Sequence, residues 1–351
     1  MKADMIGHIR AAFAGRYEVE RELGAGGMAT VFLARDPAGN PVALKLLHPE
    51  LASTVGGDRF RREIRVAARL QHPAILPVLD SGVEAVTIPG GNLELLWFTM
   101  PFIEGENAWA RLERTGPLPA AEVVRIGRTV AEALTVAHAQ GVVHRDIKPD
   151  NILLEGDRVL VADFGVARAV SEVQDKLTAT GMVVGTPTYM SPEQASGERE
   201  IDGRTDIFAL GCVLYELASG DAPFKGPTPQ ATLMRRFTGP PRPLRPVINV
   251  PEAVEAAIMR SVARDPNERF ATAAEFGAAL GGEAVPPKAT PPKAASPAAA
   301  PARPAAKPSA TPAPAPADAT AVAAKAKGCM GVLLLGVGLV SSLILVGLTL
   351  G

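Results

Sequence analysis

The stretch that decides the fold reads His-Arg-Asp-Ile-Lys-Pro-Asp-Asn and spans residues 144–151. It places Asp146 and Asn151 five positions apart in one tight loop. A carboxylate and an amide at this spacing suit a site that orients a hydroxyl nucleophile and holds a metal ion on a phosphate. The loop therefore predicts phosphoryl transfer.

A glycine-rich turn lies upstream, where residues 23–31 read Leu-Gly-Ala-Gly-Gly-Met-Ala-Thr-Val between two stretches with the alternation of strands. Glycines let a backbone approach phosphate oxygens closely, because no Cβ blocks the way. A plain hairpin is the alternative interpretation, and Ala29 stands where a G-x-G-x-x-G motif would have its third glycine. A dinucleotide-binding fold is excluded, since a strand follows the turn in place of a helix.

A strand ending in a cation comes next, Val42–Lys45, and then a helical stretch over residues 58–70 that carries Glu63. Each of these two charged residues alone would be an ordinary surface residue. Their order between the glycine-rich turn and the 144–151 loop favours a catalytic lysine whose flexible stem is fixed by the Glu63 carboxylate.

Two further motifs follow the loop: Asp-Phe-Gly at residues 163–165, and Gly-Thr-Pro-Thr-Tyr-Met-Ser-Pro-Glu at residues 185–193. With six motifs in order, the chain resembles the protein kinase superfamily over about residues 17–280. It is most similar to the bacterial membrane-anchored serine/threonine kinases of eukaryotic type. The resemblance implies an α+β, bilobal fold: an antiparallel sheet plus one helix, followed by a mostly helical lobe.

The resemblance also implies the catalytic roles. Asp146 would orient the substrate hydroxyl, and Lys148 would steady the γ-phosphoryl group; Lys148 also points to serine or threonine substrates over tyrosine. Asn151 and Asp163 would hold Mg²⁺, or Mn²⁺ in its place, because hard oxygen ligands suit these ions. The ATP-binding set comprises apolar plates around adenine, the glycine-rich turn, the lysine and a hinge: Leu23, Gly24, Ala25, Gly26, Gly27, Val31, Ala43, Lys45, Met100, Pro101, Ile103 and Leu153.

Arg145 predicts regulation by phosphorylation, because its charge would pair with a phosphate on the segment between Asp163 and Glu193. Thr178 and Thr180 are the expected autophosphorylation sites. Thr186 is expected to line the substrate groove. The alternative for all three threonines is a polar loop.

The remaining expectations concern scaffold residues. Residues 119–140 show apolar side chains at helical spacing, and residues 206–219 are apolar nearly all round, which predicts a central core helix. The resemblance implies that Asp206 braces the catalytic loop, that Phe164 follows the metal-binding aspartate, and that Glu193 forms a buried ion pair with Arg269. A solvated charge is the alternative for Arg269.

Composition divides the chain into an N-terminal extension, residues 1–16, a kinase domain, 17–280, an Ala/Pro-rich linker, 281–327, and a final apolar segment, 328–351. The linker lacks the apolar residues that a core needs, so we expect it to be disordered. The last segment carries no charge after Lys327 and is long enough to cross a bilayer, while Lys325 and Lys327 on its N-terminal side predict a cytoplasmic kinase domain at the cell membrane.

Partners follow from the same features. Protein substrates with Ser or Thr are expected, and Gly338 and Ser342 raise the hypothesis of a homodimer through closely packed membrane helices. A net charge of −1 argues against nucleic acid, and two cysteines give no disulfide framework. Two functions stay open: an active serine/threonine kinase in membrane-tethered signalling, or a catalytically weak, kinase-like nucleotide-binding scaffold.

Overall fold

The computed structural model describes residues 3–49, 52, 56–88, 91–164, 187–198, 200–245 and 249–283. All of these residues belong to one compact unit, which spans Met1–Ala289. The linker beyond residue 283 and the proposed membrane helix, 328–351, lie outside the described residues. None of the helices in the described ranges has both the length and the apolarity needed to cross a bilayer.

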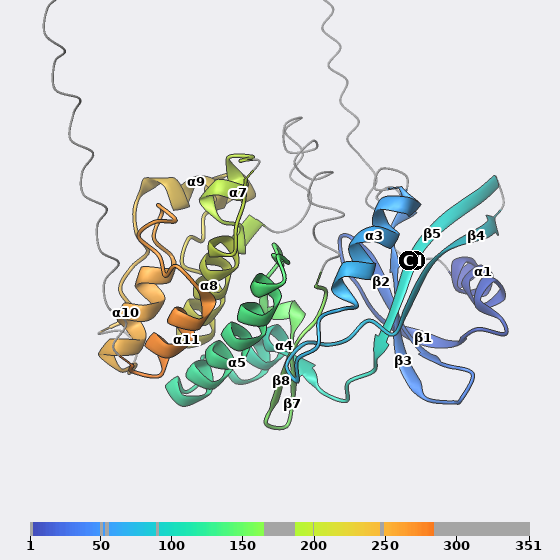
Figure 1. Cartoon of the computed structure of the whole chain (residues 1–351), viewed down its shortest axis with the longest axis horizontal. Coiled ribbons are helices and arrows are strands. Elements are labelled where there is room, and N and C mark those ends of the chain that lie inside the picture. Colours follow the sequence, from blue (N-terminus) through green and yellow to red (C-terminus); the bar gives the residue numbers. More distant parts are fainter. Residues whose placement is uncertain are drawn as a thin grey trace, which may run out of the picture. The chain divides into compact units, whose positions relative to one another are not determined.

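The N-terminal region is built on one five-stranded antiparallel sheet with the strand order β1-β2-β3-β5-β4 (Figure 1). The expected strand–turn–strand around the glycine-rich turn is present as β1 and β2, and the strand that carries Lys45 is β3. Its strands are β1 (Glu18–Ala25), β2 (Ala29–Arg35), β3 (Pro41–Leu47), β4 (Asp80–Ile88) and β5 (Gly91–Pro101).

Side chains that alternate along these strands give the sheet two apolar faces. One face packs with α3 (Gly57–Ala67), whose Phe60 and Ile64 are buried. The other face packs with α1 (Ala3–Phe13), where the ring of Phe13 meets Trp97 edge-on at 5.3 Å. The resemblance implied one helix on this sheet, and the structure adds α1 as a second because its apolar residues cover the face left by α3.

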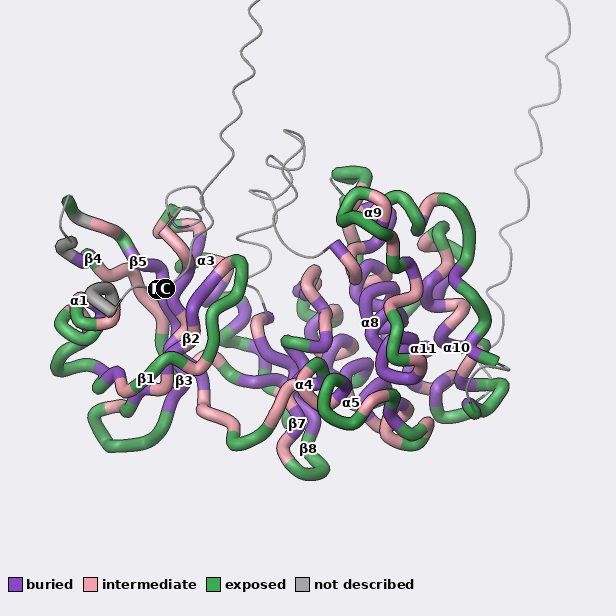
Figure 2. The backbone as a smooth tube through the Cα atoms, turned by 180° about the vertical axis from the view of Figure 1, so that it is seen from behind, coloured by how far each residue is buried: buried purple, intermediate pink, exposed green. Residues whose placement is uncertain are grey.

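The C-terminal region is mainly helical, and its central helix α8 is buried almost along its whole length (Figure 2). The helices predicted at 119–140 and 206–219 are confirmed as α5 and α8. The helices of this region are α4 (Ala108–Thr115), α5 (Ala120–Ala139), α7 (Pro192–Ala195), α8 (Arg204–Ser219), α9 (Pro229–Thr238), α10 (Glu252–Ser261) and α11 (Ala273–Leu280), with 3-10 turns η1 (Pro149–Asn151) and η2 (Pro187–Tyr189).

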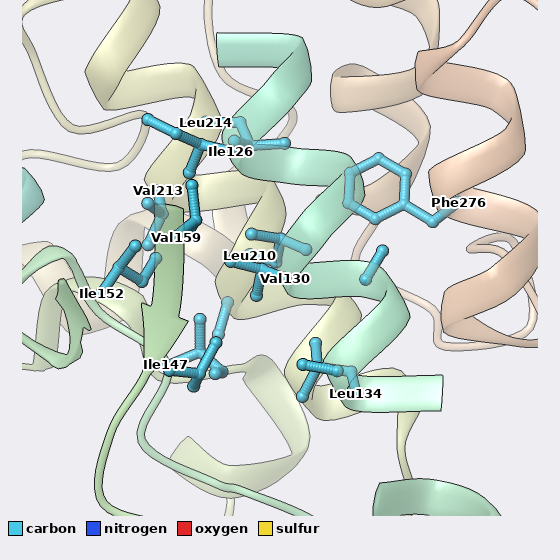
Figure 3. Close-up of a cluster of buried hydrophobic side chains, with 14 of the residues drawn as sticks. Ile126, Val130, Leu134, Ile147, Ile152, Val159, Leu210, Val213, Leu214 and Phe276 are labelled. Atoms are coloured by element: carbon cyan, nitrogen blue, oxygen red, sulfur yellow. The ribbon is translucent and has the colours of Figure 1, made fainter. Parts of the chain in front are cut away.

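The core of this region forms where α5, α8 and α11 meet (Figure 3). Ile126 and Val130 of α5 lie against Leu210 and Leu214 of α8 in this cluster. Gly127 permits the close approach, since a Cβ there would lie 2.7 Å from the methyl groups of Leu214 and Leu280. The packed helices make a rigid base for the loop at 144–151.

A small sheet connects this base to the N-terminal region. Its strands, in the order β6-β7-β8, are β6 (Glu106–Asn107), β7 (Ile152–Glu155) and β8 (Arg158–Val161). The backbone N–H of Leu76 donates to the carbonyl of Val161, and the N–H of Val161 donates to Ala74. The 144–151 loop and the residues after Val161 are thereby placed beside the N-terminal sheet.

Candidate active site

The backbone of the 144–151 loop is held from below by Asp206 of α8, which is fully buried. Its carboxylate accepts hydrogen bonds from the backbone N–H of His144 at 2.8 Å and of Arg145 at 2.7 Å. His138 Nε2 lies 2.7 Å from the same carboxylate. Arg145 has φ 67°, a left-handed conformation that only firm support sustains in a non-glycine residue. Asp206 thus lies where a brace for this loop was expected.

Two polar side chains of the loop, those of Lys148 and Asn151, contact Asp146. Lys148 Nζ lies 2.7 Å from Asp146 Oδ2, while Asn151 Nδ2 donates to the Asp146 carbonyl at 2.8 Å and to Oδ2 at 3.2 Å. Burial alone would lower the pKa of Lys148, but the charge of Asp146, followed by those of Asp163 and Asp150, raises it above the ordinary value. The lysine is therefore a firmly charged group beside the Asp146 carboxylate.

Asp163 completes the polar group from the segment after β8. Its Oδ2 lies 2.5 Å from Lys45 Nζ, and its backbone has φ 67°. Burial alone would raise the pKa of Asp163, but the Lys45 charge and hydrogen bond reverse this effect, so the pKa lies below its ordinary value. The neighbouring Phe164 is buried, with its ring edge-on to His144 at 4.6 Å.

The expected contact between Lys45 and Glu63 stays a prediction. Within the described residues, the ion pair that Lys45 makes is with Asp163. Glu63 is half-buried on α3. A long lysine side chain selects among nearby carboxylates by distance, which the order of motifs along the chain does not determine.

A cavity of about 1040 Å³ gathers the remaining expected residues. Strand register explains how: Val31 pairs with Lys45 across β2 and β3, and Ala43 pairs with Met100 across β3 and β5. The predicted catalytic, metal and ATP-binding residues that line the cavity are Leu23, Gly24, Ala25, Gly26, Gly27, Val31, Ala43, Lys45, Met100, Pro101, Ile103, Asp146, Lys148, Asn151, Leu153 and Asp163; Glu63 is the one member of these sets that does not.

The polar end of this cavity fits a divalent cation. Asp163 Oδ1 is buried and has no hydrogen-bond partner among the described residues, although a buried carboxylate oxygen normally has one. Asn151 uses its amide nitrogen toward Asp146, which leaves its amide oxygen as an acceptor on the same side chain. Two hard oxygens of this kind suit Mg²⁺.

Some cavity residues escaped the sequence reasoning. Tyr189 of η2 donates a short hydrogen bond to Glu216, a buried carboxylate within apolar α8, and both line the cavity with Lys225. An acid within the otherwise apolar stretch 207–218 of this helix was a usable signal for Glu216. Glu106 also lines the cavity, and hydrogen bonds from Arg114 and then Arg111 lower its pKa to about 2. No motif marks this residue.

The expected ion pair between Glu193 and Arg269 is present and buried. Arg269 donates to the two Glu193 oxygens at 2.7 and 2.8 Å, and the hydroxyl of Thr205 donates to Glu193 at 2.7 Å. Burial would raise the pKa of Glu193, but the hydrogen bonds and charge of Arg269 lower it. Gly165, Thr178, Thr180 and Thr186 lie outside the described residues.

Comparison with known proteins agrees with this geometry. The model of the protein kinase domain family matches residues 17–276. The serine/threonine-protein kinase PknB of Mycolicibacterium smegmatis is 40% identical over 269 residues, which cover 76% of this chain and 42% of that protein. A probable serine/threonine-protein kinase of Corynebacterium efficiens is 38% identical over 275 residues, covering 76% and 41%. The chain thus spans about two fifths of the length of these curated relatives.

A solved structure supports the same assignment. The crystal structure of the Mycobacterium tuberculosis PknI kinase domain matches with a TM-score of 0.57 and 32% sequence identity, and the match covers 77% of this chain and 96% of that one. The similarity therefore covers the region that holds the cavity, the braced loop and the buried ion pair. On its sequence, its fold and the side chains gathered in its cavity, the chain belongs to the protein kinase domain family.

Proposed function

We propose that this chain transfers the γ-phosphoryl group of ATP to serine and threonine hydroxyls of proteins. One observation carries the proposal: Asp146 lies in a cavity with a charged Lys148 at 2.7 Å and with Asn151 within hydrogen-bond distance. A carboxylate accepts the hydrogen bond of an incoming alcohol, and a fixed cation beside it stabilises the charge on a phosphoryl group in transit.

The nucleotide would occupy the cavity under the glycine-rich turn. Val31, Ala43 and Leu153 supply apolar surface for a purine, and the backbone after Met100 supplies hydrogen-bonding groups for its edge. Pro101 lacks an N–H but keeps its carbonyl as an acceptor. Asp163 and Asn151 would hold Mg²⁺, which supplies charge neutralisation on the phosphates when bound.

Lys45 has a role that its ion pair supports. Its ammonium group reaches into the cavity from β3 and already contacts Asp163 at 2.5 Å. A cation at this place would orient the phosphates beside the metal ligands. Because the lysine is held by Asp163 here, rearrangement toward Glu63 would accompany nucleotide binding in the mechanism we propose.

Activity would be tested on the intact chain with labelled ATP and Mg²⁺, followed by identification of the phosphorylated residue type. Asp146→Asn is expected to reduce transfer by about 10²–10⁴-fold, since a positioned base contributes that much. Asp157→Asn, which changes an exposed carboxylate on the β7–β8 turn, is the matched control and should retain activity. Lys45→Met should also be impaired.

Equal incorporation in all four proteins would reveal a contaminating kinase and contradict the proposal. ATP binding by the unaltered chain without any transfer would instead favour a nucleotide-binding scaffold. Label found on tyrosine alone would contradict the substrate class.

We propose further that activity is regulated by autophosphorylation at Thr178 and Thr180, whose phosphates would pair with Arg145. Mass spectrometry of the active chain should find phosphate at one or both positions. The double Thr178→Ala, Thr180→Ala variant should be less active. Full activity in that variant would refute the proposal.

The chain would act at the membrane through residues 328–351, with its kinase domain in the cytoplasm, and Gly338 and Ser342 would let two such helices pair. The support is the uncharged run and the preceding lysines in the sequence. Full-length chain should remain with membranes after an alkaline wash, whereas a chain ending at Lys327 should be released. Release of both would exclude the anchor.

A further inference from the structure

Arg236 of α9 is a buried arginine that the proposed reaction has not used. Its side chain is 1% exposed, and Nη2 donates to the carbonyl of Pro187 at 2.6 Å and, more weakly, to that of Thr232 at 3.4 Å. Its Nε and Nη1 are buried and find no acceptor in the part of the chain that the structure describes. One strong hydrogen bond therefore accounts for most of its polar contacts.

Such an arginine lowers the stability of a fold. A buried donor without an acceptor reduces the free energy of unfolding, and does so more when the group is charged. Burial lowers the pKa of Arg236, and the group that opposes this effect is the thiol of Cys212, itself within an apolar cluster. Within the described residues, no carboxylate pairs with this charge, so we look to the Pro187 hydrogen bond for the role of Arg236.

Pro187 begins η2, the turn that forms one wall of the cavity next to the catalytic loop. Pro187, Tyr189 and Met190 line the cavity together with Asp146. Two bonds from the helices below hold this turn: Tyr189 donates to Glu216 of α8, and Pro187 accepts from Arg236 of α9. A hydroxyl must approach Asp146 from the side that nucleotide leaves open, and η2 borders that side.

We propose that Arg236 is a positioning residue for the protein substrate: through the Pro187 carbonyl, it sets the height of η2 and hence the place of the substrate backbone beside Asp146. The inference rests on the proposed phosphotransfer and concerns its polypeptide substrate, with ATP binding unaffected. On this proposal, the fold tolerates the two nitrogens of Arg236 that lack acceptors because the side chain reaches η2 from α9.

The test compares Arg236→Met with Arg235→Met, the same substitution at the exposed neighbour on α9. In the Arg236→Met chain we expect the KM for a peptide substrate to rise about tenfold, in line with the loss of a hydrogen bond to a charged group, while the KM for ATP stays unchanged. Its midpoint of urea unfolding should equal or exceed that of Arg235→Met, because an incompletely paired buried charge is removed.

A second readout does not depend on turnover. Amide hydrogen exchange in the peptide that contains residues 187–196 should be about tenfold faster in Arg236→Met than in Arg235→Met, with exchange in α5 unchanged. Arg236→Lys keeps one cationic donor and should restore slow exchange and the peptide KM to within about threefold of the original.

Several outcomes would overturn the inference. Arg236 is a structural residue if Arg236→Met fails to fold or unfolds at clearly lower urea than its control. The inference is also overturned if hydrogen exchange in residues 187–196 is unchanged, or if exchange is faster but the KM for the peptide is unchanged. If the unaltered chain transfers no phosphate, both the proposed function and the role of Arg236 toward a substrate are wrong. The exchange experiment would still decide whether Arg236 holds η2 in place.

Discussion

Two buried arginines in the helical region differ in how completely their nitrogens are paired. Arg269 bonds Glu193 with two nitrogens, and its Nε donates to the Ala263 carbonyl at 2.8 Å. Arg236, equally buried, has acceptors in the described structure for one nitrogen of three. The fully paired Arg269 connects Glu193 of α7 to the segment before α11. The incompletely paired Arg236 contacts Pro187, which lines the cavity.

The same contrast separates two buried glutamates. Glu193 faces Arg269, and its pKa lies below the ordinary value. Glu216 is contacted by the hydroxyl of Tyr189, and burial raises its pKa despite that bond and the charge of Lys225. We infer that charges in the first site hold the fold, while those in the second shape the cavity wall at some cost in stability.

The largest expected effect is on the paired site. Arg269→Met leaves Glu193 as a buried, uncompensated carboxylate, so the free energy of unfolding should fall by about 3–5 kcal/mol. Urea unfolding followed by circular dichroism measures the change. The double variant Glu193→Leu, Arg269→Met should recover much of the loss; if it is no more stable than Arg269→Met alone, the pairing argument is wrong.

A smaller loss is expected for Thr205→Val, which removes the 2.7 Å hydrogen bond to Glu193 and the longer 3.1 Å one shared with the Ser191 hydroxyl, with little change in shape. A hydrogen bond to a charged group contributes about 1.5–3 kcal/mol, and the free energy of unfolding should drop by that amount. Thr135→Val, which removes a bond to a neutral helix carbonyl on α5, is the control and should cost less. Equal losses in free energy of unfolding for the two variants would contradict the idea that the charge of Glu193 strengthens this hydrogen bond.

The two glutamates predict opposite slopes of stability against pH. Glu193 has a lowered folded pKa, so its stabilisation is present above its unfolded pKa near 4.5 and is lost as pH falls through the folded value. Glu216 has a raised folded pKa, so stability declines as pH rises from near 4.5 through the folded value. Urea midpoints from pH 3 to 7 should lose the first slope in Glu193→Gln and the second in Glu216→Gln. Identical profiles in both variants would contradict the assignment.

The smallest effect is expected for Lys225→Met. Its ammonium group is 71% exposed, forms an ion pair with Asp221 at 3.0 Å, and lowers the pKa of Glu216 by its charge. Exposed charge pairs contribute at most about 1 kcal/mol and are screened by salt. Stability should therefore change by less than that, and the difference should vanish at 1 M NaCl. A large loss would mean that the second site is electrostatically paired after all.

Much of the fold and of the cavity could be predicted from local motifs. The order of the glycine-rich turn, Lys45, the 144–151 loop and Asp163 sufficed to place those residues in one cavity, and the carboxylate of Asp206 lies beneath the loop as expected. These predictions succeeded because each motif carries its own backbone geometry. The order of motifs also indicated the strands and helices between them.

Other features depend on distances that local sequence does not encode. Lys45 forms an ion pair with Asp163, and which carboxylate this lysine reaches depends on how the elements around it pack. Arg236 was invisible, since nothing near it in sequence distinguishes a buried arginine from the exposed Arg235. The α1 helix did leave a signal that was not used: Ile6, Ile9 and Phe13 have helical spacing.

That helix has a practical consequence for anyone preparing shorter versions of the protein. The family match begins at Tyr17, which invites removal of everything before it. Removing these residues would take Ile9 and Phe13 away from the sheet. The indole of Trp97 and the apolar residues around it would then be exposed to solvent. The truncated protein would therefore be prone to aggregate. Low solubility of such a protein would reflect the loss of α1 and would say nothing about its catalytic residues.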